Sequence, residues 1–129
     1  MQEKSSSFMP DAHLEESAKL FGILSEVSRL KLLRALMGGS LTVTELVDST
    51  GMKQGNVSKH LGVLLQARFV ARDREGNFAR YRLSDPRLPA LCALMCERID
   101  DDLRAVVQRL SDQQGFGSSR TSATDAQRL

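Results

Sequence analysis

The apolar residues of this chain change their spacing near residue 68, and this change limits the folds that the chain can adopt. Over residues 54–67 the apolar side chains recur three or four positions apart, which places them on a single helix face. They are Val57, Leu61, Leu64 and Leu65. The next two segments, 69–74 and 78–83, abandon this spacing and flank a Glu75-Gly76-Asn77 sequence that is typical of a hairpin turn. We therefore expect a helix followed directly by a β-hairpin.

The other segments complete a winged helix-turn-helix that is mainly α with a small β-hairpin, in the order α-α-α-α-β-β-α. The remaining expected elements are a helix from Asp11, a helix from near Glu26 or Ser28 to Gly38-Gly39, a short extended stretch over 41–43, a third helix capped by Thr44 and ended by Gly51, and a long last helix opened by Pro86 and Pro89.

The composition predicts one domain between two disordered ends. The chain has 129 residues, 41% of them hydrophobic, which suits a single globular domain over residues 11–111. Residues 1–10 are polar and rich in serine, and residues 112–129 consist mainly of small and polar types. Such segments cannot bury enough apolar surface to fold, so we expect both to be disordered.

Several classes of protein are excluded at this point. No run approaches the roughly 18 apolar residues of a membrane span, and the N-terminus lacks the apolar core of a secretory signal. Two cysteines are too few for a disulfide framework, so a cytoplasmic protein is expected. The sequence also lacks a phosphate loop, a catalytic triad and a metal-ligand cluster, so we expect no enzyme.

The basic residues are concentrated in the middle of the chain. The whole chain carries 18 basic and 16 acidic side chains, a net charge of +2. Residues 51–87 hold eight of the basic and only three of the acidic side chains. A basic middle on an otherwise acidic chain favours binding to a polyanion.

The helix face opposite the apolar stripe carries side chains that suit the edges of DNA bases. A helix that enters the major groove needs short polar and basic side chains in its first two turns. Those turns hold Gln54, Asn56, Ser58, Lys59 and His60, with Gly55 letting the backbone approach closely. On the hairpin, four arginines can contact phosphates or the minor groove: Arg72, Arg74, Arg80 and Arg82. These ten residues form the predicted binding site for double-stranded DNA.

Four segments of the chain resemble the ArsR/SmtB (arsenical-resistance-repressor) family: residues 24–33, 41–47, 54–64 with its Val-Ser-Lys-His-Leu run, and 74–83. The resemblance spans about residues 14–110. It implies a homodimer that binds a palindromic operator and represses transcription until an inducer releases it. The ten apolar positions of the last helix, more than a core of this size can cover, also favour a two-fold dimer.

The chain departs from the family pattern at three places. Arg68 stands where the family usually has a glycine that ends the recognition helix, so we expect the helix to end differently here. Thr42-Val43-Thr44 stands where the family's metalloid site has Cys-Val-Cys, and hydroxyls cannot hold a soft ion. The last helix has no histidine, so the family's zinc site of Asp and His pairs is not expected.

Cys92 and Cys96 are separated by one helical turn and share a face of the last helix. They can be two small packing residues, because free cysteine is often buried. They can equally form a thiol sensor, since two thiolates at this spacing can ligate a soft metal or metalloid ion such as arsenite. Family members that sense persulfides carry a further cysteine on the second helix, which this chain lacks. Packing and an inducer site therefore both stay open.

The alternative function is a winged helix that binds other proteins without sequence-specific DNA binding. Such a module would lack a helix face rich in hydrogen-bond donors and would expose apolar residues on its wing. The arginines of this hairpin favour DNA.

Overall fold

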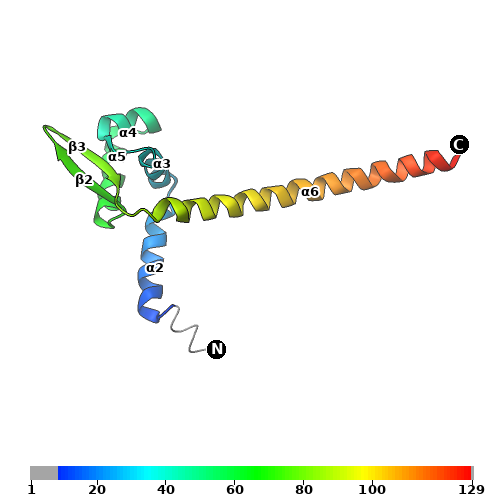
Figure 1. Ribbon diagram of the computed structural model, residues 1–129, viewed down its shortest axis with the longest axis horizontal. Coiled ribbons are helices and arrows are strands. Elements are labelled where there is room, and N and C mark those ends of the chain that lie inside the picture. Colours follow the sequence, from blue (N-terminus) through cyan, green and yellow to red (C-terminus); the bar gives the residue numbers. More distant parts are fainter. Residues whose placement is uncertain (1–8, 129) are drawn as a thin grey trace. The chain divides into compact units, whose positions relative to one another are not determined.

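The structure is a computed structural model that describes the backbone of residues 9–128 and the side chains of residues 9–114. It contains two compact units, the first ending at Leu88 and the second beginning at Pro89. In chain order its elements are α2 (Asp11–Leu24), α3 (Val27–Leu36), β1 (Leu41–Thr42), α4 (Val43–Thr50), α5 (Gln54–Gln66), β2 (Val70–Glu75), β3 (Phe78–Leu83) and α6 (Leu88–Arg128) (Figure 1). The predicted order of helices and hairpin is confirmed.

The three strands form one antiparallel sheet in the order β1-β3-β2. Glu75 pairs with Phe78, so the hairpin loop consists of Gly76 and Asn77 alone. Gly76 has a φ of 62°, a conformation that glycine adopts without steric cost. The short extended stretch predicted near residue 41 is β1, whose Leu41 pairs with Tyr81 of β3.

The core of the first unit is built mainly from leucine and lies between α3, α4, α5 and the base of the hairpin. Its buried members are Leu32, Leu33, Leu36, Leu46, Val57, Leu61, Leu64, Val70 and Leu88. Burying a side chain of this size contributes roughly 1.5–3 kcal/mol. The stripe predicted on the helix over 54–67 is therefore the face of α5 that packs into this core.

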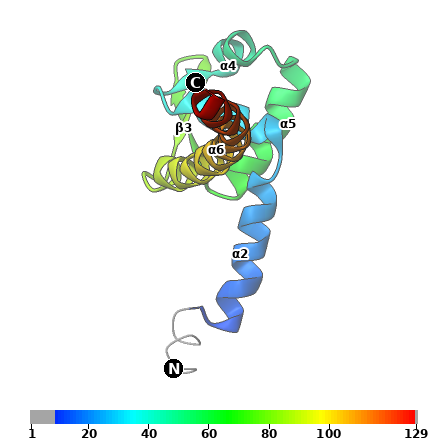
Figure 2. The same cartoon turned by 90° about the vertical axis from the view of Figure 1, so that its right-hand side faces the viewer.

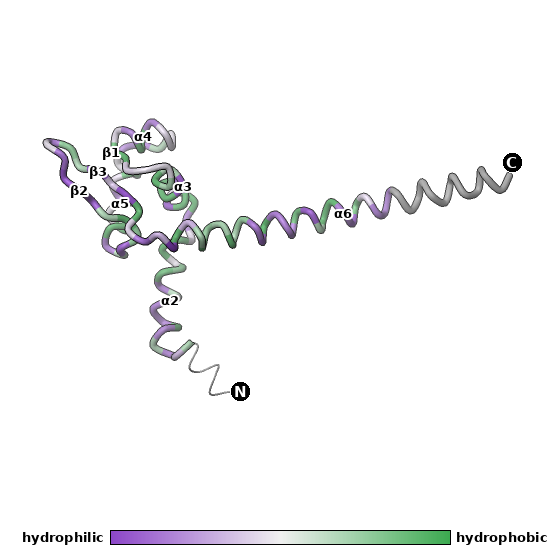
Figure 3. Tube along the Cα trace, viewed as in Figure 1, coloured by the Kyte–Doolittle hydropathy of each residue, from purple (hydrophilic) through white to green (hydrophobic). Residues whose placement is uncertain are grey.

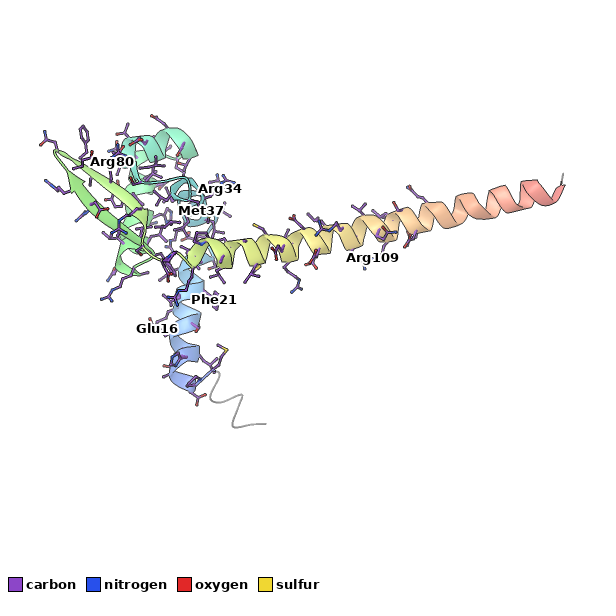
Figure 4. The ribbon with its side chains drawn as sticks, viewed as in Figure 1. Glu16, Phe21, Arg34, Met37, Arg80 and Arg109 are labelled. Carbon is purple, nitrogen blue, oxygen red and sulfur yellow. The ribbon has the colours of Figure 1, made fainter. Side chains whose placement is uncertain are left out.

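The buried face of α3 carries Leu32, Leu33 and Leu36. Leu30 and Met37 are exposed. Leu30 and Met37 lie seven residues apart and so share a stripe beside the core-facing one. Figure 4 labels Met37 among the side chains of this helix.

Helix α4 begins two residues before the predicted position. The Thr42 side chain accepts a hydrogen bond from the backbone N–H of Glu45, and the Glu45 carboxylate accepts one from the backbone N–H of Thr42, each at 3.2 Å. This reciprocal capping box satisfies two donors at the helix start. The prediction that Thr44 is the cap was wrong, because only Thr42 stands three residues before a glutamate.

Helix α5 ends in a left-handed residue despite lacking a glycine. Arg68 has a φ of 65°, and the backbone N–H groups of Arg68 and Phe69 donate to the carbonyls of Leu65 and Leu64. These two bonds are the Schellman pattern of a helix C-terminus. The expectation that the helix would end differently was wrong: the arginine takes the glycine conformation at a cost of roughly 1–2 kcal/mol.

Helix α2 contributes no buried residue, and its Leu14 and Phe21 are exposed. In two views it extends away from α3, α4 and α5 (Figures 1 and 2). Of the helices in the first unit, α2 therefore contributes least to the core.

Helix α6 stays helical through residues 112–128, where the composition predicts a disordered tail. No proline follows Pro89, so every residue of this stretch keeps the backbone N–H that a helix needs. The disorder predicted for residues 1–8 falls outside the described residues. Among the helices that the structure describes, none is long and apolar enough to cross a membrane.

Candidate nucleic-acid interface

A helix-turn-helix is formed by α4, a three-residue turn and α5. Gly51 ends α4 in the left-handed conformation, with a φ of 72°, and its N–H donates to the carbonyl of Val47. The turn then leads into α5 at Gln54. Because α5 buries the stripe that includes Val57, its other face is left to solvent.

The exposed face of α5 carries nearly all the side chains that the sequence predicts to contact bases. Those that the structure exposes are Gln54, Gly55, Asn56, Ser58 and Lys59. The first turn contains no acidic residue, and Lys53 at the cap position makes no side-chain bond to it. The first-turn N–H groups are thus left without an intrahelical partner and carry a partial positive charge. This end of α5 suits a negatively charged ligand.

His60, the remaining predicted residue on α5, is buried and only 6% exposed. Its Nδ1 accepts a hydrogen bond from Nε of Arg29 on α3, at 3.3 Å. The prediction that His60 lies on the face opposite the apolar stripe was wrong, and its contact with DNA stays a prediction. His60 lies three residues after Val57, and this spacing places it on the edge of the buried stripe.

Two of the four hairpin arginines lie on the sheet face that leads into the core. Side chains alternate along a strand, so Arg72 and Arg74 share the face of buried Val70. Both are exposed. Within the part of the chain that the structure describes, neither has a carboxylate within ion-pair distance. Their charges are therefore available to an anion.

The other two hairpin arginines lie on the opposite face and are paired. Arg82 Nε lies 2.7 Å from Asp73 Oδ2, and Arg80 Nε lies 2.8 Å from Glu75 Oε2. The sequence predicts the same role for all four arginines. Strand register divides them, because Arg80 and Arg82 stand opposite Asp73 and Ala71, which lie on the other face of β2 from Arg72 and Arg74.

Arg80 also connects the hairpin to the start of α4. Its Nη1 lies 3.4 Å from Glu45 Oε1 and donates to the carbonyl of Ser40 at 3.2 Å (Figure 4). The pKa of Glu45 is lowered, first by the hydrogen bonds from Thr42 and then by the charge of Arg80. The carboxylate that caps α4 thus also holds the wing.

The tip of the hairpin carries one exposed aromatic residue. Phe78 is 68% exposed and lies beside the Gly76-Asn77 loop. The neighbouring strand β2 is hydrophilic towards the tip (Figure 3). Phe78 is absent from the predicted site, although its place next to the loop is visible in the sequence.

The predicted sensor residues lie on α6. Cys92 is half-buried and Cys96 is exposed. Partial burial raises the pKa of the Cys92 thiol, and the neighbouring Cys96 adds to the rise. Among the described residues there is no group of three or more His, Cys, Asp or Glu side chains that could hold a metal ion. One chain therefore offers at most two thiolates to a soft ion.

Comparisons with known proteins agree with this geometry. The model of the family "Bacterial regulatory protein, arsR family" matches residues 26–72. The "Probable mercury resistance operon repressor" of Streptomyces lividans is 36% identical over 86 residues, which cover 67% of this chain and 69% of that protein.

Solved structures are similar as well. The AntR antimony-specific transcriptional repressor superposes with a TM-score of 0.66 at 34% identity, covering 74% of this chain and 87% of that one. The homodimeric winged helix-turn-helix DNA-binding domain of Mb0332 from Mycobacterium bovis superposes with a TM-score of 0.66 at 29% identity, covering 73% and 87%.

The fold and the exposed face of α5 define a winged helix-turn-helix DNA-binding regulator. The chain belongs to the ArsR family of bacterial transcriptional repressors. The predicted class of protein, a DNA-binding transcriptional regulator, is confirmed, and the alternative of a protein-interaction module has no support among these relatives.

Proposed function

We propose that the chain binds a palindromic operator as a homodimer, represses transcription there, and releases the operator when a soft, thiol-seeking inducer binds on α6. The observation that carries the proposal is the exposed donor face of α5 beside the unpaired Arg72 and Arg74. The cytoplasm, expected from the sequence, is the compartment in which such a repressor would meet its operator.

The proposed dimer rests on the apolar stripe of α6. Its positions are Cys92, Met95, Ile99, Leu103, Val106 and Leu110, and the last three follow the first three by 11 residues each. An 11-residue repeat matches a nearly straight α-helix, so the stripe runs along one side. All but Cys92 are exposed in the single chain. A contiguous exposed apolar stripe marks an interaction surface.

A second copy of the chain is the proposed occupant of this stripe. Identical stripes related by a two-fold axis bury each other, which is the commonest arrangement of soluble oligomers. The solved structure of the Mb0332 domain is a homodimer. Such a dimer would present two copies of α5 to half-sites about one DNA turn, roughly 34 Å, apart.

We assign different roles to the predicted contact residues. Gln54 and Asn56 carry amides that can pair with two atoms of adenine, and Ser58 and Lys59 can reach bases or phosphates. Arg72 and Arg74 are assigned to phosphates. Arg80 and Arg82, whose charges are partly neutralised, are assigned to holding the shape of the wing.

Selection from a pool of random DNA duplexes tests the operator proposal. We expect an enriched motif with two-fold symmetry and half-site centres about 10–11 base pairs apart, bound by two chains per duplex in analytical ultracentrifugation. The variant Gln54→Ala should discriminate less between bases at one position of each half-site, with a loss of roughly 1–3 kcal/mol in binding preference. Enrichment of a motif without symmetry, or binding of one chain per site, would contradict the proposal.

The inducer site is proposed at Cys92 and Cys96. Thiolates prefer soft ions, and the two sulfurs of one chain can be joined by those of a second copy across the stripe. Because burial raises the pKa of Cys92, ion binding must displace a proton from that thiol. For a soft metal cation, whose binding releases the thiol protons to solvent, we therefore expect the affinity to rise as the pH increases from 6 towards 9. Arsenite should show no such rise, because its hydroxyl groups take up the thiol protons and leave as water.

Release experiments with cysteine variants test this site. The variant with both Cys92→Ser and Cys96→Ser should bind the operator like the wild type and no longer release it on addition of arsenite, an oxidant or a persulfide donor. Release that persists would place the sensor elsewhere. Unfolding or loss of operator binding without any inducer would show that the cysteines are packing residues.

A further inference from the structure

The side chain of Arg29 joins three helices of the first unit at one point. From the first turn of α3, its Nε donates to Nδ1 of His60 on α5 at 3.3 Å. Its Nη1 donates to the carbonyl of Ile23 in the last turn of α2, at 3.1 Å. Its Nη2 lies 2.8 Å from Glu26 Oε2, at the start of α3. One planar guanidinium therefore holds an imidazole, a helix end and a carboxylate.

These bonds lie largely out of water. The Arg29 side chain is 15% exposed and the His60 side chain 8%. A polar group that loses its partner in such a place also lacks water to replace it, so substitutions there cost more than on the surface. The direction of each bond also matters, because the donors of arginine have a fixed planar geometry.

The bond to His60 determines where the imidazole carries its proton. Nδ1 accepts from Arg29, so Nε2 is the ring nitrogen that is left to donate a hydrogen bond. Glu26 Oε2 lies 4.0 Å from the same Nδ1. His60 is thus used through the nitrogen that faces α3, one turn after Asn56 on the helix that presents the base-contacting side chains.

We propose that Arg29 and His60 are positioning residues for DNA recognition: their hydrogen bond fixes the rotation of α5 against α3 and the end of α2. This inference rests on the proposed operator binding. It adds Arg29 and His60 as residues that act on DNA recognition indirectly, through their hydrogen bond to each other. If the bond is lost, α5 keeps its apolar stripe in the core but is free to turn slightly. The donors on its exposed face would then miss the base edges while phosphate contacts persist.

Two substitutions of His60 separate positioning from direct contact. Asparagine carries its side-chain oxygen at the same number of bonds from Cβ as Nδ1, so His60→Asn keeps an acceptor for Arg29. Glutamine extends to the position of Nε2, so His60→Gln keeps a donor there and removes the acceptor that faces Arg29. The third variant, Arg29→Lys, keeps the charge and removes the planar set of donors.

Affinities of the full chain for the selected operator and for a random duplex are measured by fluorescence anisotropy, at a temperature where circular dichroism shows each variant folded. We expect His60→Asn to bind the operator within about threefold of the wild type. His60→Gln and Arg29→Lys should each lose about tenfold or more on the operator and little on random DNA. The double variant should lose clearly less than the sum of the two single losses, because both substitutions remove the same bond between Arg29 and His60.

Other results overturn the inference. Glutamine binding like the wild type while asparagine is weak would mean that Nε2 contacts DNA directly. Equal losses on operator and random DNA, or additive losses in the double variant, would mean that the bond serves only stability. Wild-type affinity in all variants would mean that the bond has no part in recognition. Failure of the wild type to prefer any duplex would instead overturn the proposed function, and with it this inference.

Discussion

Helices α5 and α6 carry similar apolar stripes, but only the stripe of α5 is buried within its own chain. The stripe of α5 packs into the core through Val57, Leu61 and Leu64, which are buried. On α6, Ile99 and the residues that continue its stripe remain exposed. The same helical pattern therefore builds the fold in one case and offers an interface in the other.

The arginines of the hairpin divide in the same way, into charges that are paired within the chain and charges that are not. Arg80 and Arg82 are paired with carboxylates of their own hairpin, whereas Arg72 and Arg74 have no such partner among the described residues. A side chain that is satisfied internally supports shape, and one that is left free is available to DNA. This distinction can be tested one substitution at a time.

The largest effect is expected in the core-facing stripe of α5. Leu61→Ala removes a side chain that is 1% exposed and should lower the free energy of unfolding by roughly 2–5 kcal/mol. Urea denaturation followed by circular dichroism measures this loss. The loss should be the same at low and high protein concentration if the stripe packs within one chain. A concentration-dependent loss would show that the α5 stripe also takes part in assembly.

The corresponding change on α6 should act on assembly. Ile99→Asp places a charge in the stripe that we assign to the dimer, so the dissociation constant of the dimer should rise by about 100-fold or more. Sedimentation velocity over a dilution series measures it. The surface variant Glu97→Gln, on the same helix, is the control and should dissociate like the wild type. A dimer of unchanged stability would show that the stripe is not the interface.

A smaller effect separates the two faces of the wing. Arg74→Ala removes a free charge and should make the dependence of log affinity on log salt shallower by about one unit, equally for operator and random DNA. Arg80→Ala should leave that slope nearly unchanged and weaken operator binding through the lost link to Glu45 and Ser40. Titrations at several salt concentrations measure both. Equal changes of slope would mean that the paired arginine contacts phosphate as well.

The smallest effect is expected at the end of α5. Arg68→Gly removes the steric cost of a left-handed arginine while making the unfolded chain more flexible, so the gain in unfolding free energy should be about 1 kcal/mol or less. Thermal unfolding monitored by circular dichroism detects a shift of this size. A destabilised glycine variant would show that the Arg68 side chain contributes more than its strain costs.

Local pattern was enough to predict the elements and the kind of site. The α5 stripe, the β-hairpin that turns at Gly76 and Asn77, and the donor face with Gln54 and Asn56 all follow from local sequence patterns, and the structure has all three. Such features depend on the periods of helix and strand, which are properties of the backbone. That is why a single sequence suffices for them.

Which polar side chains already have a partner within the chain depends on the packing between elements. His60 lies at the border of the α5 stripe, and its buried side chain accepts a hydrogen bond from Arg29 of α3. Strand register places Arg82 on the same sheet face as Asp73, with which it forms an ion pair, and places Arg74 on the other face without a carboxylate partner among the described residues. These outcomes depend on side chains brought together from distant or opposite segments, so no period within one segment contains them. The sequence alone determined which elements form and which residues share a face, and packing between elements determined which residues of that face remain free to bind.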